Sequence, residues 1–219
     1  KTGIHIHVSE DAADSRICIE KYGKTAMGRL AAAGLLDGNS LIGHGVHATD
    51  EDLSLLARAG GTLVTNPESN MGNAVGSLDA DRARKAGVRL ALGTDGFTAD
   101  VAKEAAILRI AQSARAKDPR VGWDIAGGAP FDENARLASR LYGASIGVIQ
   151  PGAVADLILV DYDPPTPLTI ESFLGHFLFG IAAAPVAMTV VAGKIVMKDG
   201  NVLGYDEPKI AERARTAAR

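Results

Sequence analysis

Short apolar segments alternate with helical patterns along the first part of the chain, and this alternation restricts the fold more than any other feature. Four segments have strand character, and a helical pattern follows each of them: residues 3–8, 40–45, 61–66 and 88–93. Short apolar strands that alternate with helices form parallel sheets, because each parallel pair needs a crossover connection. The sequence therefore predicts an α/β fold with four parallel β/α units.

Residues capable of chemistry stand at or just after the ends of these four segments. They are His7 and Glu10, then His44, then Asn66, and finally Asp95. In β/α barrels the carboxyl ends of the strands carry the active site. Chance polarity at strand ends would account for one or two of these residues, but not for His, His and Asp in succession. We therefore predict a site at this edge.

The residue types at this edge suit a divalent metal that activates water. Such a metal uses neutral imidazole and carboxylate ligands and keeps one position open. His7 and Asp95, from different strands, are the predicted metal ligands. Glu10 is placed to move protons, and His44 to polarise the atom under attack. His5 shares a strand face with His7 but lies one layer deeper, so we expect it in the core or behind the ligands.

Composition limits the classes of partner. The 219 residues are 47% hydrophobic with a net charge of −3 and no basic cluster, which argues against nucleic acid as a partner. Cys18 is the only cysteine, so no internal disulfide can form; we expect it buried on a helix, in a reducing compartment. Gly180 and Pro185 interrupt the longest apolar run. We expect a soluble, cytoplasmic protein that does not enter a membrane.

The last third of the chain has a different character. A strand is predicted at residues 156–161, and three short strands follow between residues 186 and 205, with turns at Ala192-Gly193 and Asp199-Gly200. We predict three regions: a β/α domain over residues 1–148, an all-β part over 149–205 and an exposed helical tail over 206–219.

The segment "TNPESNMGNAVGS", residues 65–77, is rich in Asn, Ser and Gly and has no periodicity. This composition predicts a loop, and its place after a strand end puts the loop at the mouth of the site. A plain surface connection is the alternative. We predict that Asn66 and Asn70 contact the substrate.

Five motifs occur in an order that resembles the amidohydrolase superfamily, and most of all its cytosine-deaminase and chlorohydrolase branch. They are "HVSE", "LIGHGVH", "TNPESNMGNAVG", "LGTDGFTAD" and "PGAVADLILVDYDPPTPL". Through "NPESNMGNAVG" and "DYDPPTPLT" the likeness extends to the aminohydrolases associated with selenium metabolism. The resemblance covers essentially the whole chain.

This resemblance implies the C-terminal half of a (β/α)8 TIM-type barrel, strands five to eight, followed by the C-terminal part of a small β-sandwich. His7 matches the metal-binding histidine of the fifth strand, and Glu10 the glutamate that shuttles protons. His44 matches the sixth-strand histidine that contacts the activated water or the substrate. Asp95 matches the eighth-strand aspartate that binds metal and takes a proton from the water, so it is both ligand and catalytic residue.

The sequence departs from the family pattern in two places. The family's first-strand His-x-His pair, which supplies two metal ligands, would lie upstream of Lys1 together with strands one to four. Thr65 stands where relatives often carry His. We therefore expect the isolated piece to be inactive, to need the N-terminal half of the same protein as a partner, and to form a homo-oligomer through its open sheet edges.

The predicted function is hydrolysis of a carbon–nitrogen bond other than a peptide bond. A metal-dependent aminohydrolase would deaminate a small nitrogen heterocycle, with zinc as the first choice of metal and iron as the alternative. A chlorohydrolase acting on a halogenated triazine-like ring is one competing hypothesis. A catalytically inert protein of the same fold, kept for binding or assembly, is the other.

Overall fold

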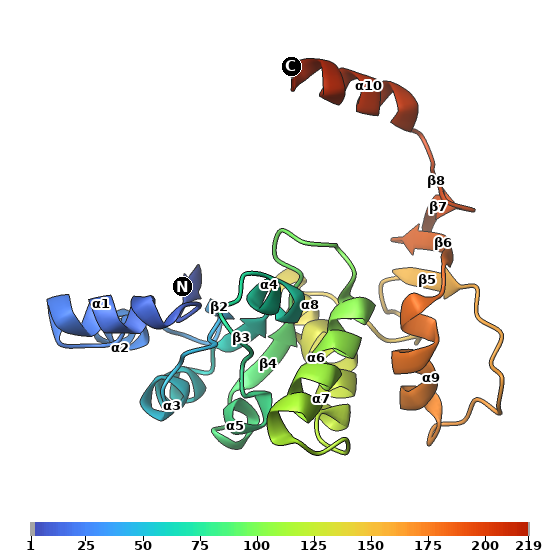
Figure 1. The fold of residues 1–219 in the computed structure, drawn as a ribbon. Coiled ribbons are helices and arrows are strands. Elements are labelled where there is room, and N and C mark those ends of the chain that lie inside the picture. The colour runs from blue at the N-terminus through green and yellow to red at the C-terminus, as the bar shows by residue number, and fades with distance from the viewer. Residues whose placement is uncertain (1–2, 219) are drawn as a thin grey trace.

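The computed structural model describes residues 3–218, and its first sheet is parallel, with strands in the order β1-β2-β3-β4 (Figure 1). Its strands are β1 (His5–Val8), β2 (Leu41–His44), β3 (Thr62–Thr65) and β4 (Arg89–Leu92). The register places one residue from each strand in a row across the sheet: His7, Gly43, Val64 and Ala91. The predicted α/β fold with four parallel strands is confirmed.

Helices cover one face of this sheet and form the core with it (Figure 1). They are α2 (Ala26–Ala32), α3 (Asp50–Ala59), α5 (Ala80–Lys85) and α6 (Val101–Ala116). Two further helices, α1 (Ala12–Tyr22) and α4 (Pro67–Gly72), contribute no residue to this core. Alternate strand residues point to opposite faces, and Ile42, Leu63 and Leu90 are the buried members on the helical side. Leu53 and Leu108 belong to the same buried cluster. The opposite face carries His7 and is therefore the side of the sheet on which chemistry is possible.

The prediction of a continuous loop over residues 65–77 is wrong, because Pro67–Gly72 forms the short helix α4. Proline at the first helical position has its φ already set for a helix and lacks the N–H that would go unpaired there. Ser69 and Asn70 are also buried, so tertiary contacts hold a helix that composition alone disfavours.

Two predictions of burial are also wrong. His5 is exposed, because β1 is the last strand of the sheet and none of residues 3–218 forms a strand beyond it. Cys18 is only half-buried on α1, a helix without a single buried residue. Both errors fall at the same end of the sheet, where apolar side chains such as Ile6 and Ile17 are exposed as well.

The other edge of the sheet is partly closed by a side chain. After α6 the chain forms α7 (Trp123–Gly128), a π-helical turn and then α8 (Asn134–Tyr142). Asn134 Oδ1 accepts a hydrogen bond from the backbone N–H of Leu92 at 2.9 Å, and its Nδ2 donates to the Leu92 carbonyl at 2.9 Å. The carboxamide thus takes the place of a neighbouring strand on β4.

The second sheet is antiparallel, with strands in the order β5-β6-β7-β8. Its strands are β5 (Leu157–Val160), β6 (Val186–Val191), β7 (Lys194–Lys198) and β8 (Asn201–Val202). Positive φ angles at Ala192-Gly193 and Asp199-Gly200 form the predicted turns. The boundaries proposed after residues 148 and 205 stay predictions. The all-β character predicted for residues 149–205 is wrong, because a helix and a 3-10 turn lie between β5 and β6.

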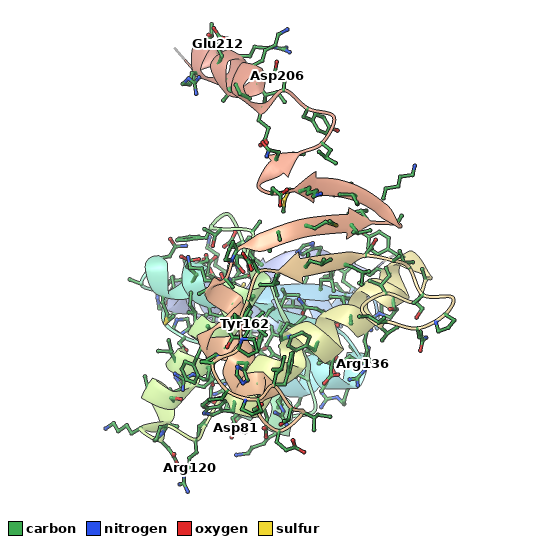
Figure 2. The ribbon with its side chains drawn as sticks, turned by 90° about the vertical axis from the view of Figure 1, so that its right-hand side faces the viewer. Asp81, Arg120, Arg136, Tyr162, Asp206 and Glu212 are labelled. Atoms are coloured by element: carbon green, nitrogen blue, oxygen red, sulfur yellow. The ribbon has the colours of Figure 1, made fainter. Side chains whose placement is uncertain are left out.

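Helix α9 (Phe173–Phe179) connects β5 to β6 and packs against α6. Tyr162, between β5 and α9, shares a 2.7 Å hydrogen bond with Nδ1 of His176 on α9 (Figure 2). Helix α10 (Glu207–Ala217) has no buried residue and stands apart from the rest of the molecule in both views (Figures 1 and 2). No helix within residues 3–218 combines the length and the apolar character needed to cross a bilayer.

Asp79 offers a test of how α5 is attached to α6. Its side chain accepts the N–H of Arg82 at 2.9 Å as the cap of α5 and lies 3.2 Å from Arg115 on α6. Partial burial opposes ionisation, but these two contacts prevail and hold the pKa of Asp79 below its usual value of 3.8. Its contribution to stability is therefore present above that value and is lost as the pH falls through the lowered pKa.

We expect Asp79→Ala to lower the free energy of unfolding at neutral pH by about 1–2 kcal/mol, since both the cap and the ion pair are lost. Asp79→Asn keeps an acceptor for the N–H of Arg82, so its free energy of unfolding should fall less. Because Asn does not ionise, the contribution of residue 79 to the loss of stability in acid should also disappear. Urea denaturation at neutral pH and below pH 3.8 measures both effects. Equal losses in the two variants would show that the cap is unimportant.

Candidate metal and catalytic site

The backbone is strained at the carboxyl ends of three strands. Ser9 after β1, His44 at the end of β2 and Asp95 after β4 have φ angles of 54°, 69° and 51°. A non-glycine residue in this region costs about 1–3 kcal/mol and persists only where its surroundings enforce it, commonly at functional sites. The strain falls on the same edge of the sheet at which the sequence places the chemistry.

His44 is the centre of this edge and is completely buried. Its Nδ1 lies 2.7 Å from Asn70 Oδ1 and 3.5 Å from Asn66 Nδ2. The shorter contact is to a carbonyl oxygen, so Nδ1 carries the proton and donates it, which leaves Nε2 with a free lone pair. This Nε2 is buried and has no hydrogen-bond partner among residues 3–218.

Two carboxylates face the free nitrogen of His44. Glu10 Oε2 lies 3.6 Å and Asp95 Oδ2 lies 3.9 Å from Nε2, and both carboxylates are partly accessible to solvent. A buried acceptor that faces carboxylates across a gap, with nothing donating to it, is suited to a cation or to a bound water. This arrangement is the strongest indication that the edge binds a ligand.

His7 joins the same cluster from β1. One potential ligand atom from each of His7, Glu10 and His44 lies within 4.8 Å of the other two. The rings of His7 and His44 meet edge to face, with centroids 4.6 Å apart. Imidazole nitrogens beside carboxylates, with the unpaired Nε2 among them, fit a divalent metal of the zinc type. The group of three includes Glu10 and not Asp95, so the choice of Asp95 as the carboxylate ligand stays a prediction.

Asp95 is held ionised by its neighbours. Ser69 Oγ donates to Oδ2 at 2.6 Å, and the N–H of Gly96 donates to Oδ1 at 2.8 Å. The Ser69 hydrogen bond is the main reason that the pKa of Asp95 lies below its usual value, against the opposing effect of partial burial. A fixed, charged carboxylate beside His44 can serve as a metal ligand and as a proton acceptor.

The structure brings the predicted site residues together at one edge, while their individual roles stay predictions. Asn66 and Asn70 both lie beside Nδ1 of His44, and Asn70 is almost wholly buried. Their contact with a substrate stays a prediction. The sequence reasoning missed Ser69, which orients Asp95. Its position next to Asn70 in the same motif was the available signal.

Comparisons with known proteins identify the family of the chain. The family model described as "Amidohydrolase family" matches residues 1–196. The chain belongs to the amidohydrolase family. The resemblance inferred from its motifs is thereby confirmed at the level of the family.

Curated relatives in this family are named 5-methylthioadenosine/S-adenosylhomocysteine deaminase. The protein from Thermococcus sibiricus is 33% identical over 198 residues, covering 89% of this chain and 46% of the relative. That from Halobacterium salinarum is 32% identical over 224 residues, covering 98% of this chain and 50% of the relative. The chain thus spans about half the length of the curated relatives it matches.

Among solved structures, an adenosine deaminase from Xanthomonas campestris with bound zinc matches with a TM-score of 0.84 and 26% identity. The match covers 98% of this chain and 49% of that one. Atrazine chlorohydrolase from Arthrobacter aurescens, solved with zinc, matches with a TM-score of 0.75 at 17% identity, over 98% of this chain and 48% of that one. At that identity the match shows the fold alone.

Metal titration of the 219-residue chain tests the cluster directly. Of the two imidazoles in this cluster, His7 is exposed and His44 is buried. We therefore expect weak binding of zinc or cobalt with little fixed geometry. His7→Ala should remove this binding, whereas the control His5→Ala, on the same strand, should leave it unchanged. Calorimetry with zinc and the visible spectrum of cobalt report both. Equal effects of the two substitutions would show that the metal binds elsewhere.

Proposed function

We propose that this chain is the C-terminal half of a metal-dependent hydrolase that deaminates a nitrogen heterocycle. The observation that carries the proposal is the buried, unpartnered Nε2 of His44, which faces Glu10 and Asp95 at 3.6 and 3.9 Å within the described chain. Membership of the amidohydrolase family and relatives named as deaminases support it. In this proposal the four parallel strands are strands five to eight of a (β/α)8 barrel.

His7 and Asp95 would hold the metal, with His44 close beside it. Zinc is the first choice, because nitrogen and carboxylate ligands suit it and a related deaminase was solved with bound zinc; iron is the alternative. When bound, the metal would supply a polarised water as the nucleophile.

Glu10, Asp95 and His44 divide the proton movements between them. Asp95, ionised beside Ser69, accepts a proton from the attacking water. Glu10, which is partly accessible to solvent, delivers protons to the ring nitrogen and to the departing amine. His44, fixed by Asn70, hydrogen-bonds the oxygen that enters. The ring carbon gains the oxygen of the water and loses its amino group as ammonia. Both protons of that water are used, one on the ring nitrogen and one on the departing amine, so Asp95 and Glu10 return to their starting protonation states.

A flat aromatic substrate also suits the apolar side chains near this edge. Met71 and Phe97 are both exposed, and the ring of Phe97 lies against Gly72 on α4. A Cβ at Gly72 would stand 3.0 Å from that ring, so glycine permits the close contact. Gly72 is one helical turn from Ser69, which hydrogen-bonds Asp95. An exposed ring beside the catalytic carboxylate can pack on a heterocycle.

The competing functions fit less well. The chloride-displacing alternative is supported only by a likeness of fold. A catalytically inert binding protein does not account for the strained backbone beside the cluster of His7, Glu10 and His44. We place the enzyme in the cytoplasm, in agreement with its single cysteine.

The rest of the site would come from a partner that joins at β1. This edge is bordered by exposed apolar residues, Ile6 on β1 and Ile17 and Ile19 on α1, whereas Asn134 already occupies part of the β4 edge. We propose that the partner is the N-terminal half of the same protein, with a second copy of this chain as its substitute in isolation.

The direct test of function is a screen for ammonia release. The longer protein that contains this chain, loaded with zinc, is offered aminated purines and their nucleosides, aminated pyrimidines and triazines, with chloride release followed in parallel. Deamination of a purine nucleoside supports the proposal. Chloride release without ammonia favours the chlorohydrolase, and inactivity towards every class contradicts the proposal.

Glu10→Gln in that longer protein should keep the metal but lower kcat by about 100- to 10,000-fold, because a general acid/base is lost while the ligands stay. Glu20→Gln, an exposed change on α1, is the matched control and should have no effect. Metal content by mass spectrometry and initial rates measure both. An undiminished kcat would refute the role of Glu10.

The 219-residue chain alone should neither turn over substrate nor stay monomeric, because its metal site and its sheet are both incomplete. We expect light scattering after size exclusion to find oligomers, and Ile17→Glu on the exposed face of α1 to reduce them. Activity should return when the preceding segment is supplied in trans. A monodisperse, active monomer would show that the chain is self-sufficient.

A further inference from the structure

Glu104 is a completely buried carboxylate to which the proposed chemistry gives no role. It lies in the first turn of α6. Its Oε2 accepts the backbone N–H of Glu68 at 2.9 Å, and its Oε1 has no hydrogen-bond partner within residues 3–218. Burial raises the pKa of Glu104 above its usual value. Burying a carboxylate costs free energy. An apolar residue would fill the same space without that cost, so we look for a role in the hydrogen bond that Glu104 accepts.

The contact falls at the start of α4, the helix that supports the site. Glu68 is the second residue of α4, and the next two residues make the contacts that orient the site. Ser69 donates to Asp95 at 2.6 Å, and Asn70 accepts from His44 at 2.7 Å. A displacement of α4 would therefore disturb both site residues together.

Helix α4 cannot hold this position unaided. It has six residues, too few for independent stability. Asn66 at its N-cap makes no side-chain capping hydrogen bond, because its amide lies beside the His44 ring instead. The carboxylate of Glu104 supplies the acceptor for a first-turn N–H that a capping side chain would normally provide.

A second contact from the same turn of α6 strengthens the attachment. Lys103 Nζ lies 2.6 Å from Glu68 Oε1, and Thr98 Oγ1 donates to Glu68 Oε2 at 3.0 Å. This outer contact is partly exposed to solvent, so screening weakens it. The buried contact of Glu104 is the one that water cannot replace.

We propose that Glu104 is a positioning residue, whose carboxylate fixes the start of α4 so that Ser69 and Asn70 orient Asp95 and His44. The positioning stands on the geometry alone. Its consequence for catalysis rests on the proposed function. Among the described hydrogen bonds and ion pairs, none joins Glu104 to the cluster of His7, Glu10 and His44. An effect of Glu104 on His44 is therefore expected to act through α4.

Three substitutions and a matched control separate positioning from general stability. Glu104→Gln keeps an acceptor oxygen for the N–H of Glu68, Glu104→Asp retracts it by one methylene, and Glu104→Leu removes it. Gln112→Leu is the control, because Gln112 is buried on the same helix but holds Ala80 and Leu78 through hydrogen bonds of 3.0 and 2.8 Å.

The readout is the tautomer of His44 in the 219-residue chain, from ring ¹⁵N shifts assigned by their loss in His44→Gln. We expect Nδ1 protonated in the wild type, in Glu104→Gln and in Gln112→Leu. Glu104→Leu and Glu104→Asp should give a mixture of tautomers and faster hydrogen exchange in α4. Should Glu104→Leu fail to fold, the Asp variant decides.

In the longer, active protein we expect Glu104→Asp and Glu104→Leu to lower kcat by about 10- to 100-fold with KM little changed. Glu104→Gln should have the kcat of the wild type. An unaltered tautomer in Glu104→Asp, or an equal change in Gln112→Leu, would overturn the proposal. The tautomer measurement needs no substrate. A wild type inactive in every assay would therefore refute the proposed hydrolase and leave the positioning to be judged separately.

Discussion

The hydrogen bond between His44 and Asn70 is the interaction on which the candidate site depends. His44 is wholly buried, and a buried imidazole needs a partner for its N–H. Asn70 accepts from Nδ1 at 2.7 Å, which fixes the ring and leaves Nε2 as an acceptor directed at Glu10 and Asp95. In the other tautomer, with the proton on Nε2, that proton would point into the cluster and block this nitrogen as a metal ligand. One amide oxygen thus decides what the site can bind.

This hydrogen bond forms only if α4 is held next to the carboxyl end of β2. The parallel register brings the ends of β1, β2 and β4 to one edge, and the positive φ angles at Ser9, His44 and Asp95 redirect the chain there. Such strain persists only when neighbouring contacts offset it. Helix α4 provides two of them through Ser69 and Asn70. The attachment of α4 to α6 is therefore part of the site, although it lies outside the cluster of possible ligands.

How far the sequence predicts this structure depends on the range of the interactions. Strand and helix periodicity is local, so the parallel sheet and the residues at its carboxyl edge follow from the sequence. The helical state of α4 does not, because its composition favours a loop and its support comes from Glu104, 36 residues further along the chain. Likewise, its place in the motif marks Ser69 as a candidate, but its hydrogen bond to Asp95 and that of Asn70 to His44 are long-range contacts that the local sequence does not indicate.

The errors at His5 and Cys18 have a different cause. Both predictions assumed that β1 and α1 are covered, yet in the described chain they form the open end of the sheet. His7 is exposed for the same reason, and it is the cluster's contribution from β1. If the N-terminal half joins at β1 as proposed, the same step that covers the apolar side chains also encloses His7 and brings further ligands to it. Folding and metal binding would then be completed together, because a ligand on an edge strand gains its fixed geometry only when that edge is paired.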